Sequence, residues 1–128
     1  MDKKISILVV GCGNMGASHA ISYENHDGFE ICGLVSRGDS KVELNTKLKS
    51  NYQLFKNYKE AIDLTKPDAV CISTYPDTHE EISLYALENN CHIFLEKPVA
   101  SDLRGARIII DTAIKKQLPV LVVKPIPL

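Results

Sequence analysis

The stretch Ile5-Ser6-Ile7-Leu8-Val9-Val10-Gly11-Cys12-Gly13-Asn14-Met15-Gly16 decides the fold of this chain. Its first half is an apolar run rich in β-branched residues, which predicts a buried strand over residues 5–10. Its second half has the spacing G-x-G-x-x-G and opens a helical pattern that runs to about His26, with one side formed by Met15, His19, Ala20 and Tyr23. A strand, a glycine-rich turn and a helix in this order predict the start of a βαβ unit.

Apolar runs and helical patterns continue to alternate beyond this unit. The expected strands cover residues 29–35, 53–55, 69–73, 91–95 and 119–123, and the expected helices cover 40–50, 58–65, 78–89 and 101–116. In the last helix, the spacing places Ile108 away from the core and turns five residues inward: Leu103, Ala106, Ile110, Ala113 and Ile114. The alternation predicts an α/β fold, a Rossmann-type doubly wound parallel sheet of about six strands, forming a single domain over residues 1–128.

Length and charge are those of an ordinary globular domain. Of 128 residues, 45% are hydrophobic and 24% charged, which is enough to bury a core without disulfides or metals. The 15 basic and 16 acidic residues give a formal net charge of -1. Such a chain has no broad positive field, so neither nucleic acid nor a membrane surface is an expected partner.

The cysteines and the first residues bear on cellular location. None of the four cysteines, Cys12, Cys32, Cys71 and Cys91, forms a C-x-x-C pair, so we expect neither a metal site nor a disulfide framework. The first apolar run is too short for a signal peptide, and no segment approaches the length of a membrane span. Free buried thiols suit a reducing compartment, and we therefore expect a cytoplasmic protein.

Each glycine of the turn has a physical task. Gly11 allows the tight turn out of the strand, Gly13 lets the backbone approach a pyrophosphate, and Gly16 lets the helix pack close to the strand. The helix start at Asn14 and Met15 offers unpaired N–H groups and a partial positive charge to phosphates. The hexapeptide alone is weak evidence, but its place between a strand and a helix is the context that the motif requires. We therefore expect these five residues to bind a dinucleotide; the alternative is a tight turn without a ligand.

The end of the second expected strand bears on the choice of dinucleotide. An acidic residue about 20 positions after the last glycine usually holds the ribose hydroxyls in this fold. Here the segment reads Val35-Ser36-Arg37-Gly38, with no carboxylate before Asp39. Ser36 can donate to a 2′-phosphate and Arg37 can pair with it, which favours NADP over NAD. In the alternative, Arg37 is a solvated loop residue and Asp39 takes the acidic role.

Two more segments are expected at the carboxyl edge of the sheet, where open α/β folds bind ligands. After the fourth strand, the capping-box spacing of Thr78 and Glu81 places His79 in the first turn of a helix, where it faces either the ligand or solvent. After the fifth strand, Lys97 can polarise a substrate oxygen or bind a carboxylate, and Pro98 sets the turn and can be cis. In the alternative, Glu96 and Lys97 form a surface ion pair.

These segments together resemble the N-terminal domain of the Gfo/Idh/MocA oxidoreductases, the family of glucose–fructose oxidoreductase and inositol dehydrogenase. The match covers essentially the whole chain and consists of the glycine turn, Val35-Ser36-Arg37, Thr74-Tyr75-Pro76 with His79, and Glu96-Lys97-Pro98. The resemblance implies NAD(P)-dependent hydride transfer to or from a sugar, cyclitol or similar substrate.

By position, the resemblance also implies roles for single residues. It makes Lys97 the catalytic residue, beside the nicotinamide and the reacting oxygen. It implies that Glu96 and Pro98 shape that corner of the site. The cofactor crevice would be lined by Thr74, Pro76 and His79.

Two departures from the family pattern bear on activity. The family's second domain, which supplies an Asp/His pair and most substrate contacts, has no counterpart within residues 1–128. The last strand leads into Lys124-Pro125 where the family has an arginine-containing segment, and Lys124 is the candidate for that position. We therefore expect cofactor binding by this chain and catalysis only with a further domain or a homo-oligomeric partner. The alternative function is a non-catalytic nucleotide-binding or sensing module, which needs the glycine turn but not Lys97.

Overall fold

The apolar runs form one central sheet in the computed structural model, which describes residues 3–123. The strands are β1 (Ile5–Val10), β2 (Phe29–Val35), β3 (Leu54–Phe55), β4 (Ala69–Ile72), β5 (His92–Glu96) and β6 (Val120–Val123). The helices are α1 (Asn14–Glu24), α2 (Ser40–Lys47), α3 (Tyr58–Thr65), α4 (Pro76–Glu88) and α5 (Leu103–Lys116). Every expected element is present, and its ends differ from the expected ones by a few residues.

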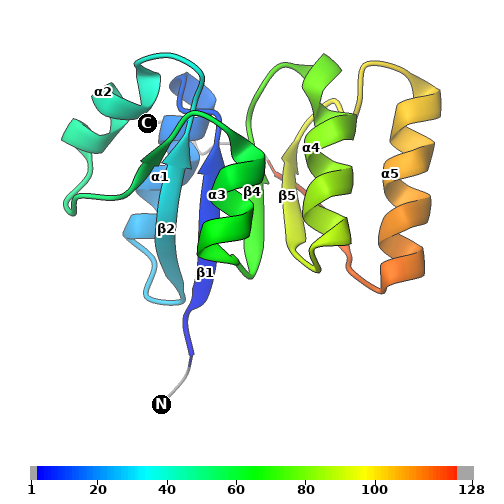
Figure 1. Cartoon of the computed structure of the whole chain (residues 1–128), viewed down its shortest axis with the longest axis horizontal. Helices are drawn as coiled ribbons and strands as arrows, with labels where there is room; N and C mark the ends of the chain where they lie inside the picture. Colours follow the sequence, from blue (N-terminus) through cyan, green and yellow to red (C-terminus); the bar gives the residue numbers. More distant parts are fainter. Residues whose placement is uncertain (1–2, 124–128) are drawn as a thin grey trace.

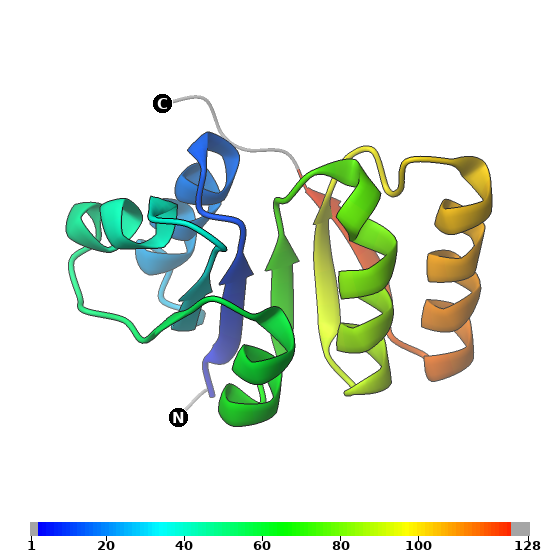
Figure 2. The ribbon, with the colours of Figure 1, turned by 45° about the horizontal axis from the view of Figure 1, so that its top comes forward.

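The strands lie in the order β3-β2-β1-β4-β5-β6, and every neighbouring pair is parallel (Figure 1). Strands β1 to β3 extend the sheet to one side of the centre, and strands β4 to β6 extend it to the other. Ligands bind open sheets of this kind at the carboxyl ends of the strands, where the order reverses. Figure 2 turns this edge, with the β1–α1 and β4–α4 turns, towards the viewer. The expected doubly wound Rossmann sheet is confirmed.

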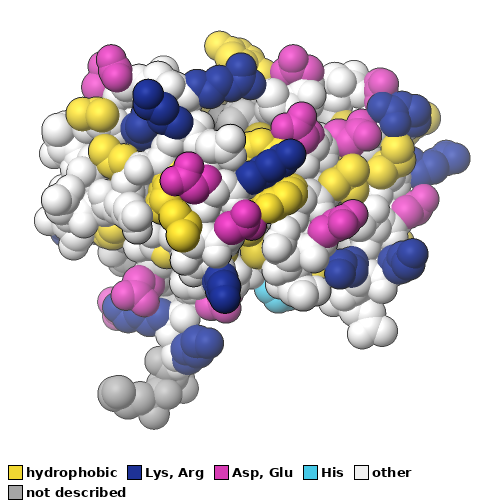
Figure 3. All heavy atoms as spheres, in the orientation of Figure 1, with side chains coloured by type: hydrophobic (Ala, Val, Ile, Leu, Met, Phe, Trp, Pro, Cys, Tyr) yellow, Lys and Arg dark blue, Asp and Glu magenta, His cyan; other side chains and the backbone are white. Residues whose placement is uncertain are grey.

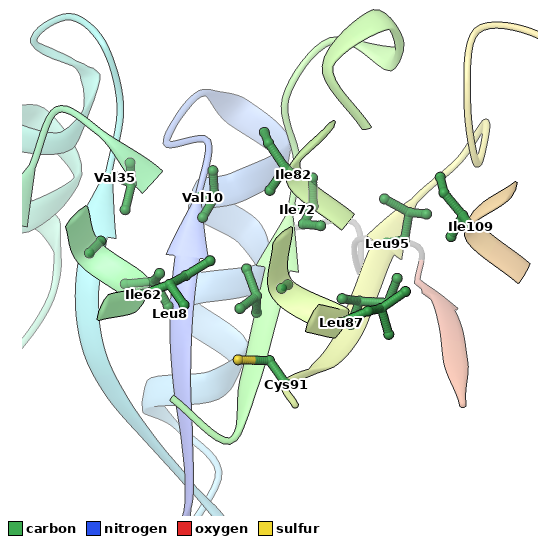
Figure 4. Close-up of a cluster of buried hydrophobic side chains, with 14 of the residues drawn as sticks. Leu8, Val10, Val35, Ile62, Ile72, Ile82, Leu87, Cys91, Leu95 and Ile109 are labelled. Carbon is green, nitrogen blue, oxygen red and sulfur yellow. The ribbon is translucent and has the colours of Figure 1, made fainter. Parts of the chain in front are cut away.

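Helices cover both faces of the sheet. Successive residues of a buried strand point to opposite faces, so its side chains pack on both sides. Leu8 and Val10 belong to a buried cluster that includes side chains of α3, α4 and α5 (Figure 4), while Ile7 and Val9 belong to one that includes side chains of α1 and α2. All four side chains are buried. This continuous burial explains why the strands read as unbroken apolar runs.

The buried face of α5 differs from the expected one. The buried residues are Gly105, Ile109 and Ala113, whereas three expected core residues are exposed: Leu103, Ile110 and Ile114. Ile108 is half-buried. The reason is that α5 packs against α4 as well as the sheet, so closely that a Cβ on Gly105 would lie 2.8 Å from the Glu80 Oε1 atom of α4. Ile110 and Ile114 instead line a shallow hollow beside β6.

The starts of α1 and α4 also differ in detail from the expectation. Met15 is 52% exposed rather than on the inward side of α1. The prediction that Thr78 and Glu81 form a capping box is wrong, since α4 begins two residues earlier at Pro76, with Tyr75 as its N-cap. Proline fits this first position because it needs no N–H partner there. The Thr78 hydroxyl donates to the Tyr75 carbonyl oxygen at 2.7 Å instead.

The surface carries charges of both signs. Acidic and basic side chains are interspersed over the face formed by α3, α4 and α5 (Figure 3). Within residues 3–123, none of the helices has the length and hydropathy needed to cross a bilayer.

Candidate functional site

The glycine turn joins β1 to α1 at the point where the strand order reverses. Gly11 has φ +97°, and a Cβ there would lie 2.5 Å from the Ser73 carbonyl oxygen at the end of β4. A Cβ on Gly16 would lie 1.8 Å from the Gly11 carbonyl oxygen. The backbone therefore requires glycine at both positions, as the spacing predicts: the first for the turn, the second for close packing.

Gly13 is different, because nothing in the protein requires glycine there. Its φ is -73°, an ordinary value for any residue, and no atom of residues 3–123 lies within 4 Å of the position of an added Cβ. Gly13 is exposed and is the N-cap of α1, whose first turn carries no acidic side chain. The exposed Asn14 and Met15 follow it. The open space therefore lies at a helix N-terminus, where unpaired N–H groups attract an anion.

The β2–α2 loop brings a buried lysine beneath the expected ribose site. The Ser36 hydroxyl donates to the Gly38 carbonyl oxygen at 2.9 Å and accepts from the Lys41 backbone N–H at 3.1 Å. Lys41 is 8% exposed, and its Nζ donates to the carbonyl oxygens of Gly38 at 2.6 Å and Ser36 at 3.1 Å. Arg37 is exposed at the tip of this loop. The loop thus exposes the Arg37 side chain, while the Lys41 ammonium and the Ser36 hydroxyl bond to the loop's own backbone.

His79 is built into the protein rather than exposed at the helix start. It is 1% exposed, with Nε2 lying 3.0 Å from the Thr74 carbonyl oxygen and Nδ1 2.9 Å from the Pro98 carbonyl oxygen. The alternative that His79 touches solvent is therefore wrong. The ring joins the end of β4 to the turn that follows β5. Thr74 and Pro76, partly buried beside it, lie at the carboxyl edge as expected.

Lys97 is exposed directly after β5, and the Lys97–Pro98 peptide bond is cis. Glu96 does not pair with its neighbour Lys97. Its Oε2 atom lies 2.7 Å from the Nε2 atom of His19 on α1, with the two side chains 13% and 7% exposed. The expected alternative of a surface ion pair between Glu96 and Lys97 is thus replaced by a buried pair between Glu96 and His19. Among residues 3–123, Lys97 has no ion-pair partner, and it lies exposed at the edge of the sheet.

Two residues of this edge, His19 and Lys41, are absent from the site that the sequence predicts. His19 stands out in the sequence only as a polar residue on the inward side of a helix. Lys41 gives no signal, because a lysine in a first helical turn is ordinarily solvated. Lys124, expected near the substrate, lies outside the described residues.

The cysteine inside the glycine turn is a packing residue. Cys12 is buried and its thiol donates to the Val35 carbonyl oxygen at 3.4 Å. Burial raises the pKa of this thiol to about 11, so it stays protonated at neutral pH. Cys32, Cys71 and Cys91 are likewise free thiols.

A parallel sheet in this strand order, with the glycine turn at its reversal point, defines a Rossmann domain of the dinucleotide-binding class. Residues 5–124 match the model of the Gfo/Idh/MocA family, described as an oxidoreductase family with an NAD-binding Rossmann fold, and the chain belongs to this family. The expected family and its nicotinamide-dinucleotide-binding fold are confirmed.

Curated relatives and solved structures agree with this assignment. Inositol 2-dehydrogenase of Corynebacterium glutamicum (strain R) is 28% identical over 120 residues, covering 93% of this chain and 36% of that protein. D-glucoside 3-dehydrogenase of Escherichia coli (strain K12) is 27% identical over 112 residues, covering 87% and 32%. GenD2 from gentamicin A biosynthesis, in complex with NAD, shares the fold with a TM-score of 0.87 at 22% identity, covering 95% and 35%. The chain thus spans about a third of the length of these proteins.

Proposed function

We propose that this chain binds a nicotinamide dinucleotide at the carboxyl edge of its sheet and forms the cofactor domain of an oxidoreductase acting on a sugar, cyclitol or related alcohol. The observation that carries the proposal is the open space at Gly13. The backbone requires glycine at Gly11 and Gly16, but not at Gly13, where Ser, Thr, Asp or Asn would also suit the N-cap of α1. A ligand that approaches the backbone explains why no side chain stands at Gly13. A pyrophosphate is the ligand that fits a glycine at a helix N-terminus.

The residues at this edge fit the two ends of such a cofactor. The turn of Gly11, Gly13 and Gly16, with the first N–H groups of α1, would hold the pyrophosphate. The Ser36 loop would hold the adenosine ribose, and the ends of β4 and β5 would lie along the nicotinamide side, with Thr74, Pro76 and Lys97. The bound cofactor would accept or donate the hydride.

The charges of the Ser36 loop favour NADP over NAD. A 2′-phosphate adds negative charge and three acceptor oxygens, which suit the exposed Arg37 guanidinium, whereas the Ser36 hydroxyl proton is already donated to the Gly38 carbonyl oxygen. The buried ammonium of Lys41, 2.6 Å from the Gly38 carbonyl oxygen, adds positive charge under the same loop. Asp39 is the only carboxylate among residues 35–42, and its side chain makes no capping bond to α2.

Lys97 has the position of a group that acts on the reacting oxygen. Its exposed ammonium follows β5 at the ligand edge, where it can hydrogen-bond an alcohol or carbonyl oxygen and stabilise charge that develops there. The neighbouring Glu96 and His79 are engaged inside the protein, by His19 and by backbone carbonyls. We place most substrate contacts outside residues 3–123, since Lys97 is exposed among them.

We also propose a reducing compartment, the cytoplasm, for this protein. Its four cysteines are free, and burial raises the pKa of the Cys71 and Cys91 thiols to about 11. Buried protonated thiols act as small apolar side chains and need no oxidising environment.

The substitution Gly13→Val tests the phosphate site. A branched side chain would occupy the space that we assign to the pyrophosphate, so affinity for NADPH should fall at least about tenfold, or about 1.4 kcal/mol. Because nothing in the part of the chain that the structure describes lies within 4 Å of the added Cβ, the variant should fold. Titration of NADPH, followed by nicotinamide fluorescence, measures the affinity, and circular dichroism checks the fold.

The control is Asp27→Val, which places the same side chain on the exposed turn between α1 and β2, at the opposite edge of the sheet. This variant should keep the affinity of the unmodified protein. Equal NADPH affinity in a folded Gly13→Val protein would show that the pyrophosphate binds elsewhere.

A further inference from the structure

The turn that carries Lys97 is held on two sides by buried histidines. This turn, residues 97–100, is here called the Lys97 turn. His19 bonds Glu96, the residue before the turn, and His79 bonds the carbonyl oxygen of Pro98 within it. The two histidines come from different helices, α1 and α4, which lie on opposite faces of the sheet. The Lys97 turn is therefore tied to both helical layers.

The bond between His19 of α1 and Glu96 links the proposed phosphate-binding helix to the Lys97 turn. The α1 N-terminus is the proposed pyrophosphate site, and His19 lies three residues after Gly16. Its Nε2 atom is 2.7 Å from Glu96 Oε2, a short contact between side chains that are 7% and 13% exposed. Hydrogen bonds to a buried carboxylate are among the stronger ones in proteins, because little water competes for the oxygen.

Packing fixes the His19 ring in this position. Its ring stacks near that of Tyr23, with centroids 6.3 Å apart and planes at 21°. Tyr23 in turn packs against Phe94 of β5, with centroids 6.2 Å apart. The imidazole thus sits in an aromatic cluster between α1 and β5, and it has little freedom to leave Glu96.

We propose that His19 is a positioning residue, which through Glu96 holds the Lys97 turn at a set place relative to the phosphate-binding end of α1. The proposal rests on the proposed function for the identity of the ligand, but not for the contact itself. The consequence is that the helix of the phosphate site and the nicotinamide end of the cofactor site are connected by the His19–Glu96 pair. Loss of this pair should loosen the Lys97 turn, which His79 still contacts at Pro98, while leaving the phosphate site intact.

Three substitutions of His19 distinguish the effect of losing its hydrogen bond to Glu96 from the effect of losing the packing of its ring. The bond is made by Nε2, and the side-chain nitrogen of glutamine reaches about as far as this atom, whereas that of asparagine reaches only to the level of Nδ1. His19→Gln should therefore keep the bond to Glu96, and His19→Asn and His19→Ala should lose it. A general packing defect would affect glutamine and asparagine variants alike. His92→Ala, at the exposed start of β5, is the control for loss of a histidine.

The first readout is amide hydrogen exchange of the unliganded chain, followed by mass spectrometry in peptides that cover residues 94–100. We expect the amides of Leu95 and Glu96, which lie in the β5 ladders and lead into the Lys97 turn, to exchange roughly tenfold faster in His19→Ala and His19→Asn, and to stay near the unmodified rate in His19→Gln and His92→Ala. Equal rates in all variants, or equal acceleration in His19→Gln and His19→Asn, would overturn the proposal. If His19→Ala does not fold, the glutamine and asparagine pair still decides.

The second readout compares two ligands by calorimetry. The probe 2′,5′-ADP reaches only the adenosine end of the site, whereas NADPH also reaches the Lys97 turn. His19→Asn should weaken NADPH several-fold and leave 2′,5′-ADP unchanged; equal weakening of both would show a defect of α1 and overturn the positioning role. If the unmodified chain binds neither probe, the proposed function fails, and the exchange rates alone decide on His19.

Discussion

Charge at the Ser36 loop is set by single residues. Arg37 is exposed at its tip, and the buried Lys41 ammonium donates to the carbonyl oxygens of Ser36 and Gly38 from below. An additional phosphate on the ribose would meet the Arg37 guanidinium directly, and the buried Lys41 ammonium would add positive charge behind the loop. NAD, which has hydroxyls at the same place, would gain less from them.

The substitution Arg37→Asp should therefore reverse the cofactor preference. The unmodified chain should bind NADP more tightly than NAD, and in the variant the ratio of the two affinities should fall by about tenfold or more, since a carboxylate repels the phosphate and accepts from ribose hydroxyls. Calorimetry with both nucleotides measures the ratio. Arg107→Asp, an exposed site on α5 with the same change in charge, should leave it unaltered. Tighter NAD binding by the unmodified chain would make Asp39 the ribose ligand.

The sequence predicts the glycines of the site better than its polar network. The roles of Gly11 and Gly16 follow from their spacing, because a strand that turns directly into a helix leaves no room for a Cβ. Burial of Lys41 has no local signal, and the spacing that places His19 on the inward side of its helix does not identify its partner. Each is buried with partners that are distant in the sequence or belong to the backbone, such as Glu96, 77 residues from His19.

At the scale of elements, α5 tests how well a helical pattern predicts a buried face. The apolar spacing points to Ile110 and Ile114, yet Ile109 is the isoleucine that is fully buried, in the cluster shown in Figure 4. A helix at the end of a sheet packs on a neighbouring helix as well as on strands. Its apolar residues therefore spread over more than one side, and the spacing alone does not say which side is innermost.

Two isoleucine substitutions on this helix provide a matched pair. Ile109→Ala should lower the free energy of unfolding by about 2–4 kcal/mol, because it leaves a cavity in the core. Ile114→Ala removes the same atoms from a side chain that is 70% exposed, and should change stability by less than about 0.5 kcal/mol. Urea denaturation of both variants measures the difference. The reverse order would mean that the face of α5 predicted from the spacing is the buried one.

The carboxylate of Asp68, the residue before β4, joins the starts of β1 and β4. Hydrogen bonds from the Ser6 backbone N–H at 2.9 Å and the Ser6 hydroxyl at 3.2 Å lower the pKa of Asp68 below its usual value. A group with a lowered pKa in the folded state stabilises the fold above its unfolded pKa of about 3.9. That contribution disappears as the pH falls through the lower, folded value.

The variant Asp68→Asn should accordingly be less stable than the unmodified chain at pH 7, with the difference shrinking towards pH 3. Its amide oxygen can still accept, but it carries no charge to strengthen the two bonds. Melting temperatures measured across this pH range give the difference directly. A constant gap at all pH values would show that the Asp68 charge contributes nothing.

For the whole molecule, the sequence predicts the architecture well because one rule governs it. Alternation of apolar runs with helices leads to parallel strands, and parallel strands place every strand-to-helix turn at one edge. The glycine turn, the Ser36 loop, the end of β4 and Lys97 therefore lie along the same edge although they span some 85 positions of the sequence. What encloses a substrate at this edge does not follow from these residues, since Lys97 and Pro98 are exposed.

The last prediction follows from how little of the substrate site these residues enclose. A polypeptide of residues 1–128 should bind cofactor but turn over no sugar or cyclitol at an ordinary enzymic rate. Hydride transfer needs the reacting carbon held near the nicotinamide and a group that exchanges the hydroxyl proton. Lys97 can bind the oxygen, but Glu96 and His79 beside it are engaged inside the protein. A screen of inositols and sugars with NADP and NAD, followed by absorbance of the reduced nicotinamide, measures turnover. A rate of about 1 per second or more, abolished by Lys97→Ala, would show that these residues form a complete active site.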